Sequence, residues 1–132
     1  MKACFGCLFL LLVLATAALA QQDSLVVAKA EICLDVEDRQ PVEAAAVFAD
    51  TVGQIYCFSI IEGAEDSLLI THKWIRGDHE MAAVPLAVQP GAWRTWSSKR
   101  IMKEWTGEWK VDIIAPDGTV LKSVGFEIEA TE

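Results

Sequence analysis

The sequence has little positive charge and few of the residues that enzyme and metal sites require. Its 11 lysine and arginine residues are outnumbered by 19 aspartate and glutamate residues, which gives a net charge of -8, and it has only two histidines. A surface with this balance repels a phosphate backbone, so we expect no nucleic-acid partner. Past residue 20 the chain has no Cys-x-x-Cys pair, phosphate-binding glycine loop, dinucleotide fingerprint or Gly-x-Ser-x-Gly turn. We therefore expect no metal and no cofactor.

Long apolar runs are also absent, except at the N-terminus. Residues 1–20 combine Lys2, a dense apolar run from Leu8 to Leu14 and the small residues Ala18 and Ala20. This pattern predicts a signal peptide cleaved before Gln21. The alternative is an uncleaved anchor, because residues 3–20 are nearly long enough to span a bilayer, and only then is a membrane partner expected. We expect residues 21–132 to form one domain that is periplasmic or secreted.

Helical periodicity is scarce, whereas alternation of apolar and polar residues is common. It occurs over residues 26–36, 54–60, 68–76, 80–88, 109–113 and 124–128, and shorter strands fit residues 42–48 and 93–97. The turns around Gly77 and Gly118 predict two hairpins. The whole pattern predicts an all-β fold, an antiparallel immunoglobulin-like β-sandwich of about seven or eight strands. A single short helix is expected over residues 98–104, capped by Ser97 or Ser98.

The domain has two cysteines, Cys33 and Cys57, and each lies opposite the more apolar face of its predicted strand. For the second strand, this apolar face is expected to hold Tyr56, Phe58 and Ile60. If the two strands are neighbours, the sulfurs can form a disulfide on the outer side of one sheet. The alternative is a pair of free, half-buried thiols.

The five tryptophans are concentrated between residues 74 and 109, and four of them lie in the stretch 93–110. That stretch has a net charge of +3 in an otherwise acidic domain. Aromatic faces beside cationic groups can hold a sugar ring, a polyanion or an acidic strand of a partner. The candidate binding residues are therefore Trp93, Arg94, Trp96, Lys99, Arg100 and Trp105. The alternative is that the tryptophans fill the core while the cations cover their edges, as we expect for Trp74 and Trp109.

Few residues qualify for catalysis. His72 shares an apolar strand face with Trp74, so it is either a buried, hydrogen-bonded histidine or a ligand or acid–base group. His79 lies in a turn, where we expect it to be solvated. If residue 76 pairs with residue 79, His72 lies opposite residue 83 and the two histidines do not meet. Ser97 and Ser98 have no predicted catalytic partner, and acidic stretches such as residues 35–38 favour a solvated face over a calcium loop.

Several phrases of the sequence resemble a known family. They are Pro41-Val42, Tyr56-Cys57-Phe58, Thr71-His72-Lys73-Trp74, Trp93-Arg94-Thr95-Trp96-Ser97-Ser98-Lys99, Trp105-Thr106-Gly107-Glu108-Trp109-Lys110-Val111 and Asp117-Gly118. Over about 100 residues the chain resembles the bacterial family catalogued as domain of unknown function 2914. The resemblance implies a small β-rich domain, often behind a signal peptide or attached to membrane segments. It implies no activity and carries over no catalytic or binding residue.

These features favour an exported, noncatalytic binding module of the cell envelope. Its partner is expected to be an envelope protein, a glycan or an anionic component, held at the tryptophan-rich, basic stretch. One alternative is a purely structural or assembly domain whose tryptophans are internal. Another is a hydrolase with an unrecognised site, since an acidic chain easily places two carboxylates together.

Overall fold

The computed structural model describes residues 24–132, so the predicted leader lies outside the described residues. Ten strands make up all the regular structure of this part: β1 (Val26–Cys33), β2 (Asp35–Glu37), β3 (Gln40–Val42), β4 (Val47–Ala49), β5 (Gln54–Glu62), β6 (Leu68–Arg76), β7 (His79–Val88), β8 (Trp93–Arg100), β9 (Gly107–Ile114) and β10 (Val120–Glu129). The all-β prediction is confirmed. The predicted helix over residues 98–104 is wrong, because β8 continues as a strand to Arg100.

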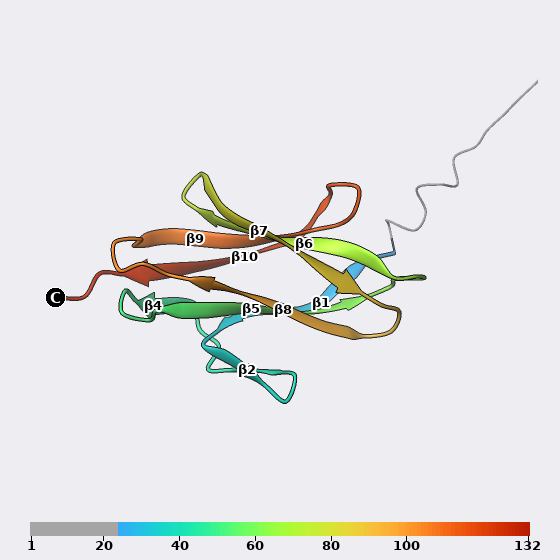
Figure 1. The fold of residues 1–132 in the computed structure, drawn as a ribbon, viewed down its shortest axis with the longest axis horizontal. Helices are drawn as coiled ribbons and strands as arrows, with labels where there is room; N and C mark the ends of the chain where they lie inside the picture. Colours follow the sequence, from blue (N-terminus) through green and yellow to red (C-terminus); the bar gives the residue numbers. More distant parts are fainter. Residues whose placement is uncertain (1–23) are drawn as a thin grey trace, which may run out of the picture.

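The strands form two large sheets and a separate hairpin. One sheet has the order β1-β5-β8, the other has the order β4-β10-β9-β6-β7, and β2 pairs only with β3. Neighbouring strands are antiparallel except for β4 and β10, which run parallel. Figure 1 shows the β9–β10 layer above the β5–β8 layer, with the β2–β3 hairpin projecting from the lower one.

Both predicted hairpins are present. Arg76 pairs with His79 across the turn at Gly77, and Gly77 has φ 61°, a conformation that suits glycine. The turn at Gly118 joins β9 to β10. One detail of the first hairpin differs from the expectation, since His72 pairs with Val84 rather than residue 83. A register shift between Trp74 and Ile75 adds one residue to β7, and this displaces by one position the pairs from Trp74 back to Leu68, which lie further from the turn.

Two predicted strands are divided. The strand expected over residues 26–36 ends at Cys33 and resumes as β2. The strand expected over residues 42–48 is split between β3 and β4, because the chain passes here from the β2–β3 hairpin to the five-stranded sheet. On one side of this crossover Ala45 N–H donates to the Ile32 carbonyl, and on the other Glu127 N–H donates to the Ala46 carbonyl.

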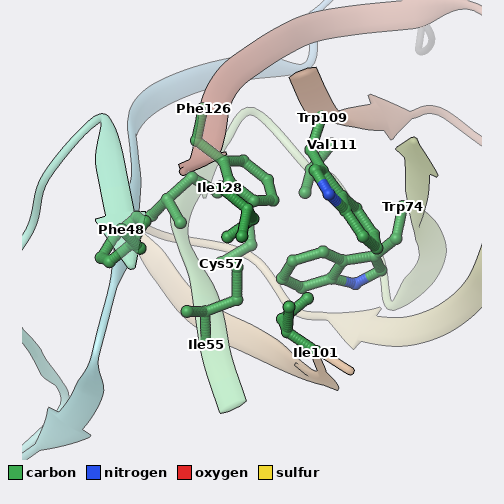
Figure 2. Packing of buried hydrophobic residues seen from close by; sticks show 10 residues of the cluster. Phe48, Ile55, Cys57, Trp74, Ile101, Trp109, Val111, Phe126 and Ile128 are labelled. Carbon is green, nitrogen blue, oxygen red and sulfur yellow. The ribbon is translucent and has the colours of Figure 1, made fainter. Parts of the chain in front are cut away.

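The core lies between the two large sheets. Trp74 and Trp109 have exposed fractions of 0% and 3%, so the prediction that they are internal is confirmed. The Phe126 ring stacks on Trp109 at a centroid distance of 5.8 Å and meets Trp74 edge-on at 6.2 Å. Figure 2 shows these rings packed together, with Ile55 and Cys57 of β5 facing them from the other sheet.

The expected disulfide between Cys33 and Cys57 is not formed, and both thiols are free. The prediction placed them on one face, but Ile32 pairs with Cys57 and Cys33 pairs with Tyr56. Since paired residues share a face and consecutive residues alternate, the register puts the two thiols on opposite faces of the sheet. The core face of β5 carries Ile55, Cys57, Ser59 and Ile61, not the face expected from sequence.

Candidate binding face and the buried histidine

Strand β8 lies at the edge of its sheet and divides the candidate residues between its two faces. Its register with β5 places Arg94 opposite Ile60, Trp96 opposite Phe58 and Ser98 opposite Tyr56. These residues lie on the outer face, and Arg100 continues the same alternation. We call Arg94, Trp96, Ser98 and Arg100 the β8 outer row. Trp93, Thr95, Ser97 and Lys99 belong to the opposite, inner face of β8.

The middle of the β8 outer row is an ordered aromatic and cationic cluster. The Trp96 ring stacks on Phe58, with 6.2 Å between ring centroids and an interplanar angle of 21°. The Arg94 guanidinium lies 5.9 Å from the centroid of the same Phe58 ring. Phe58 is fully buried, whereas Trp96 and Arg94 are half-buried. Phe58 therefore fixes the indole from one side and leaves part of its surface to solvent.

The two arginine charges of the β8 outer row are not neutralised by any carboxylate of the described residues. Arg100 and Ser98 are exposed, and Gln54 Nε2 donates to Ser98 Oγ at 3.2 Å. Within residues 24–132 neither Arg94 nor Arg100 lies within ion-pair distance of a carboxylate. The two arginines lie six positions apart along the strand, a span of about 20 Å.

The other three predicted binding residues lie elsewhere and pack against protein. Trp93 packs against the core, and its Nε1 donates to the Ala87 carbonyl of β7 at 3.0 Å. Trp105 packs beside Trp109 at the opposite end of β8, and the Lys99 ammonium lies 5.1 Å from its ring centroid. The structure thus brings together only half of the predicted set.

The inner face of β8 reaches a buried polar cluster around His72, which is 0% exposed. His72 Nδ1 lies 2.7 Å from Ser97 Oγ, and Trp74 Nε1 donates to the same hydroxyl at 3.1 Å. His72 Nε2 lies 3.2 Å from Ser59 Oγ, and this hydroxyl donates to the Thr95 carbonyl at 3.3 Å. The expectation of a buried histidine hydrogen-bonded beside a tryptophan is confirmed.

One assignment of protons satisfies every member of this cluster. Because Ser59 donates to a carbonyl, its oxygen accepts from His72 Nε2–H, and Nδ1 is then free to accept from the Ser97 hydroxyl. Ser97 in turn accepts from Trp74. This arrangement needs a neutral imidazole, and burial lowers the pKa of His72 to about 4. The cluster ties β5 and β8 of one sheet to β6 of the other.

The cluster contains a serine–histidine pair, but no substrate can reach it. Ser59 and His72 are fully buried and Ser97 is almost so. A nucleophile must contact its substrate, so we infer that this pair stabilises the fold instead. The two thiols are also fully buried. Burial raises the pKa of Cys33 and raises that of Cys57 to about 12.

His79, in contrast, is exposed in its turn, as expected, and its Nε2 lies 3.6 Å from Asp78 Oδ1.

Sequence reasoning missed two tertiary features near the sheet crossover. The Asp50 carboxylate is buried and binds Lys103 Nζ at 3.0 Å and Thr131 Oγ1 at 2.6 Å, and these contacts hold its pKa below the usual range. An apolar hollow of about 400 Å³ lies nearby, lined by Leu34, Glu43, Ala44, Ala45, Val47, Phe48, Ala49 and Val52. No sequence motif marks either feature, because Asp50, Lys103 and Thr131 are far apart in the chain and the hollow forms only where residues 43–52 pack against the rest of the fold.

The model of the family described as Protein of unknown function (DUF2914) matches residues 69–128. The chain carries a DUF2914 region. The resemblance seen in the sequence is thereby confirmed for the part from β6 to β10, which holds His72 and the whole β8 outer row. The phrases Pro41-Val42 and Tyr56-Cys57-Phe58 precede this DUF2914 region.

No curated protein matches the chain. In the part of the chain that the structure describes, no helix is long and apolar enough to cross a membrane. The same part contains no group of three or more histidine, cysteine, aspartate or glutamate side chains placed to share a metal ion.

Proposed function

We propose that the protein is a noncatalytic interaction module that binds an anionic partner through the β8 outer row. The observation that carries this proposal is the pair Arg94 and Arg100 on either side of Trp96, both without a carboxylate partner in the described residues. In a chain of net charge -8, two cations left unpaired on one strand face are available to an external anion.

The proposal includes an architecture and a compartment. The parallel pairing of β4 with β10, together with the orders β1-β5-β8 and β4-β10-β9-β6-β7, supports a sandwich of immunoglobulin-like type. The apolar leader pattern of residues 1–20 supports export to the periplasm or the exterior. The partner is then a component of the cell envelope, and the membrane itself is involved only if the leader stays uncleaved.

The main competing function is a purely structural or assembly role. Trp93 and Trp105 favour it, since both pack against the core: Trp93 Nε1 donates to the Ala87 carbonyl, and the Trp105 carbonyl accepts from Trp109 Nε1. Arg100 of the β8 outer row does not fit this role, because within residues 24–132 its exposed side chain is held by no ion pair.

Capture from an envelope extract tests the proposal. We expect the double variant Arg94→Ala and Arg100→Ala to lose most of its captured partner while staying folded, with a loss of only about 1 kcal/mol in unfolding free energy from the Arg94 hydrogen bond to the Arg39 carbonyl. Lys122→Ala is the matched control, since it removes an exposed cation from β10 in the other sheet. Equal capture by the parent and the double variant would contradict the proposal.

A further inference from the structure

The β2–β3 hairpin carries a strained turn close to the β8 outer row. Asp38 and Arg39, the two central turn residues, have φ angles of 51° and 60°. Two-residue hairpin turns with positive φ at both positions normally contain Asn-Gly or Asp-Gly. Aspartate tolerates this conformation, whereas an arginine costs roughly 1 kcal/mol there. Such strain persists only where surrounding structure holds it, and it is concentrated at functional sites.

Arg94 is the residue that holds this turn. Its Nη1 donates to the Arg39 carbonyl at 2.9 Å and so joins positions 55 residues apart in the chain. The contact places the tip of the hairpin at the Arg94 guanidinium and adds the exposed Arg39 side chain to the cations of the β8 outer row. Arg39 was not among the residues expected from sequence, because nothing near it in the chain resembles the tryptophan-rich stretch.

The three arginines differ from most lysines of the same protein. Lys29, Lys73, Lys103 and Lys110 each lie within 4.0 Å of a carboxylate. Arg39, Arg94 and Arg100 have no such partner within residues 24–132. An acidic protein that leaves its arginines unpaired on one surface presents planar, two-pronged donors, which are suited to carboxylate or phosphate groups.

We infer that the β2–β3 hairpin and the β8 outer row form one site for a carboxylated polysaccharide. This inference rests on the proposed function and specifies its partner. Trp96 supplies a fixed aromatic face for a sugar ring, because Phe58 supports its indole from behind. Arg39, Arg94 and Arg100 bind carboxylates spaced along the polymer. A neutral glycan would leave these cations unused.

The geometry of β8 favours recognition by side chains over addition of a peptide strand. One end of its free edge is tied to β7, since Trp93 Nε1 donates to the Ala87 carbonyl. An acidic peptide that added along the whole of this edge would have to displace Trp93 from its contact with the Ala87 carbonyl. A polysaccharide lying on the outer face requires no such rearrangement.

Binding to three polymers tests the inference: polygalacturonate, poly-L-glutamate and neutral dextran. We expect tight binding of polygalacturonate alone. Trp96→Ala and Arg100→Ala should each weaken it by about tenfold, the loss of one good stacking or charge-assisted contact. Lys122→Ala, the matched control, should change the affinity by less than about twofold, because screening by salt limits the effect of a distant charge.

Two substitutions in the hairpin turn test its part in the site. Arg39→Gly removes the cation, is compatible with the positive φ and should weaken polygalacturonate binding by about threefold. Asp38→Asn also tolerates this backbone conformation, removes a negative charge beside the site and should strengthen binding. If Arg100→Ala weakens binding while both hairpin variants leave it unchanged, the hairpin is not part of the site.

The outcomes also separate this inference from the proposed function. Binding of poly-L-glutamate without polygalacturonate would overturn the polysaccharide assignment and leave an anionic partner in place. If neither anionic polymer binds, the polysaccharide inference fails. If the Arg94 and Arg100 double variant also captures its partner from envelope extract as well as the parent does, the proposed function fails too.

Discussion

The two faces of β8 treat polar groups in opposite ways. On the inner face, Ser97 shares its hydroxyl with His72 and Trp74, and the Thr95 carbonyl accepts from Ser59. On the outer face, Arg94 and Arg100 have no carboxylate partner in the described residues. Adjacent residues of one strand therefore serve different purposes, because alternation sends each to a different environment.

This difference distinguishes the residues that stabilise the fold from the residues that are available for binding. A buried polar group that lacks a partner costs 1–3 kcal/mol or more, so the inner cluster is complete. An exposed arginine costs nothing when it is unpaired, so its position need not serve the fold. The residues that most resemble catalytic machinery, serine and histidine, are the ones that the fold itself requires.

Loss of the inner cluster should have the largest effect. His72→Ala removes two hydrogen bonds, opens a cavity and leaves Ser59 and Ser97 with fewer partners, so we expect a loss of about 3 kcal/mol or more in unfolding free energy. Urea denaturation measures it. His79→Ala is the control, and its exposed position predicts a change within about 0.5 kcal/mol. Equal effects of the two variants would remove the distinction between the histidines.

Acid should produce a loss of similar size. In the folded protein the pKa of His72 is about 4, while an unfolded histidine has a pKa of about 6.5. Between these values the unfolded chain binds a proton that the folded chain does not. Stability is therefore complete above pH 6.5 and falls by about 3 kcal/mol as the pH drops to 4. Unfolding measured across this range should show a shallower slope for His72→Gln, and an unchanged slope would argue against this origin.

The two thiols, Cys33 of β1 and Cys57 of β5, are both buried but lie on opposite faces of their sheet. Cys57 faces the core, and burial holds its pKa at about 12. We expect a thiol reagent to label it at least about 100-fold more slowly in the native protein than in the unfolded chain, since the thiolate is the reactive species. Peptide mapping should find Cys33 and Cys57 unlinked without reductant. A linked pair of peptides would show that the register differs from the one described.

The β8 outer row should contribute little to stability. Arg94→Ala removes the hydrogen bond to the Arg39 carbonyl and should cost about 1 kcal/mol. Arg100→Ala removes an exposed side chain that has no ion pair within residues 24–132 and should stay within about 0.5 kcal/mol of the parent. Thermal unfolding of both variants measures this. A large loss of stability for Arg100→Ala would mean that Arg100 stabilises the fold, and this would weaken its assignment to binding.

The smallest expected effect is a gain. Arg39→Gly relieves the positive φ of the hairpin turn at the cost of extra chain entropy, so the unfolding free energy should rise by about 0.5 kcal/mol. Denaturant titration of this variant beside the parent detects the sign. A loss of stability would mean that the Arg39 side chain itself anchors the hairpin.

Local patterns were sufficient for much of the fold. Alternation around Trp74 and Trp109 correctly assigned both residues to the core, because a strand with one apolar face must bury it. Glycines at positions 77 and 118 marked two hairpin turns through their conformational freedom. Alternation alone failed where register mattered, since irregularities between Val27 and Lys29 and between Trp74 and Ile75 each change the register of a strand pair by one residue.

The sequence by itself determined the strand content, the internal tryptophans and the DUF2914 resemblance, because these depend on residues close together in the chain. Only the tertiary structure decided that Cys33 and Cys57 lie on opposite faces and that Trp93 and Trp105 pack inward. It also brought Arg39 to Arg94 across 55 residues. Such contacts depend on which strands pair and in which register, and the free energy that selects a register comes from the whole core.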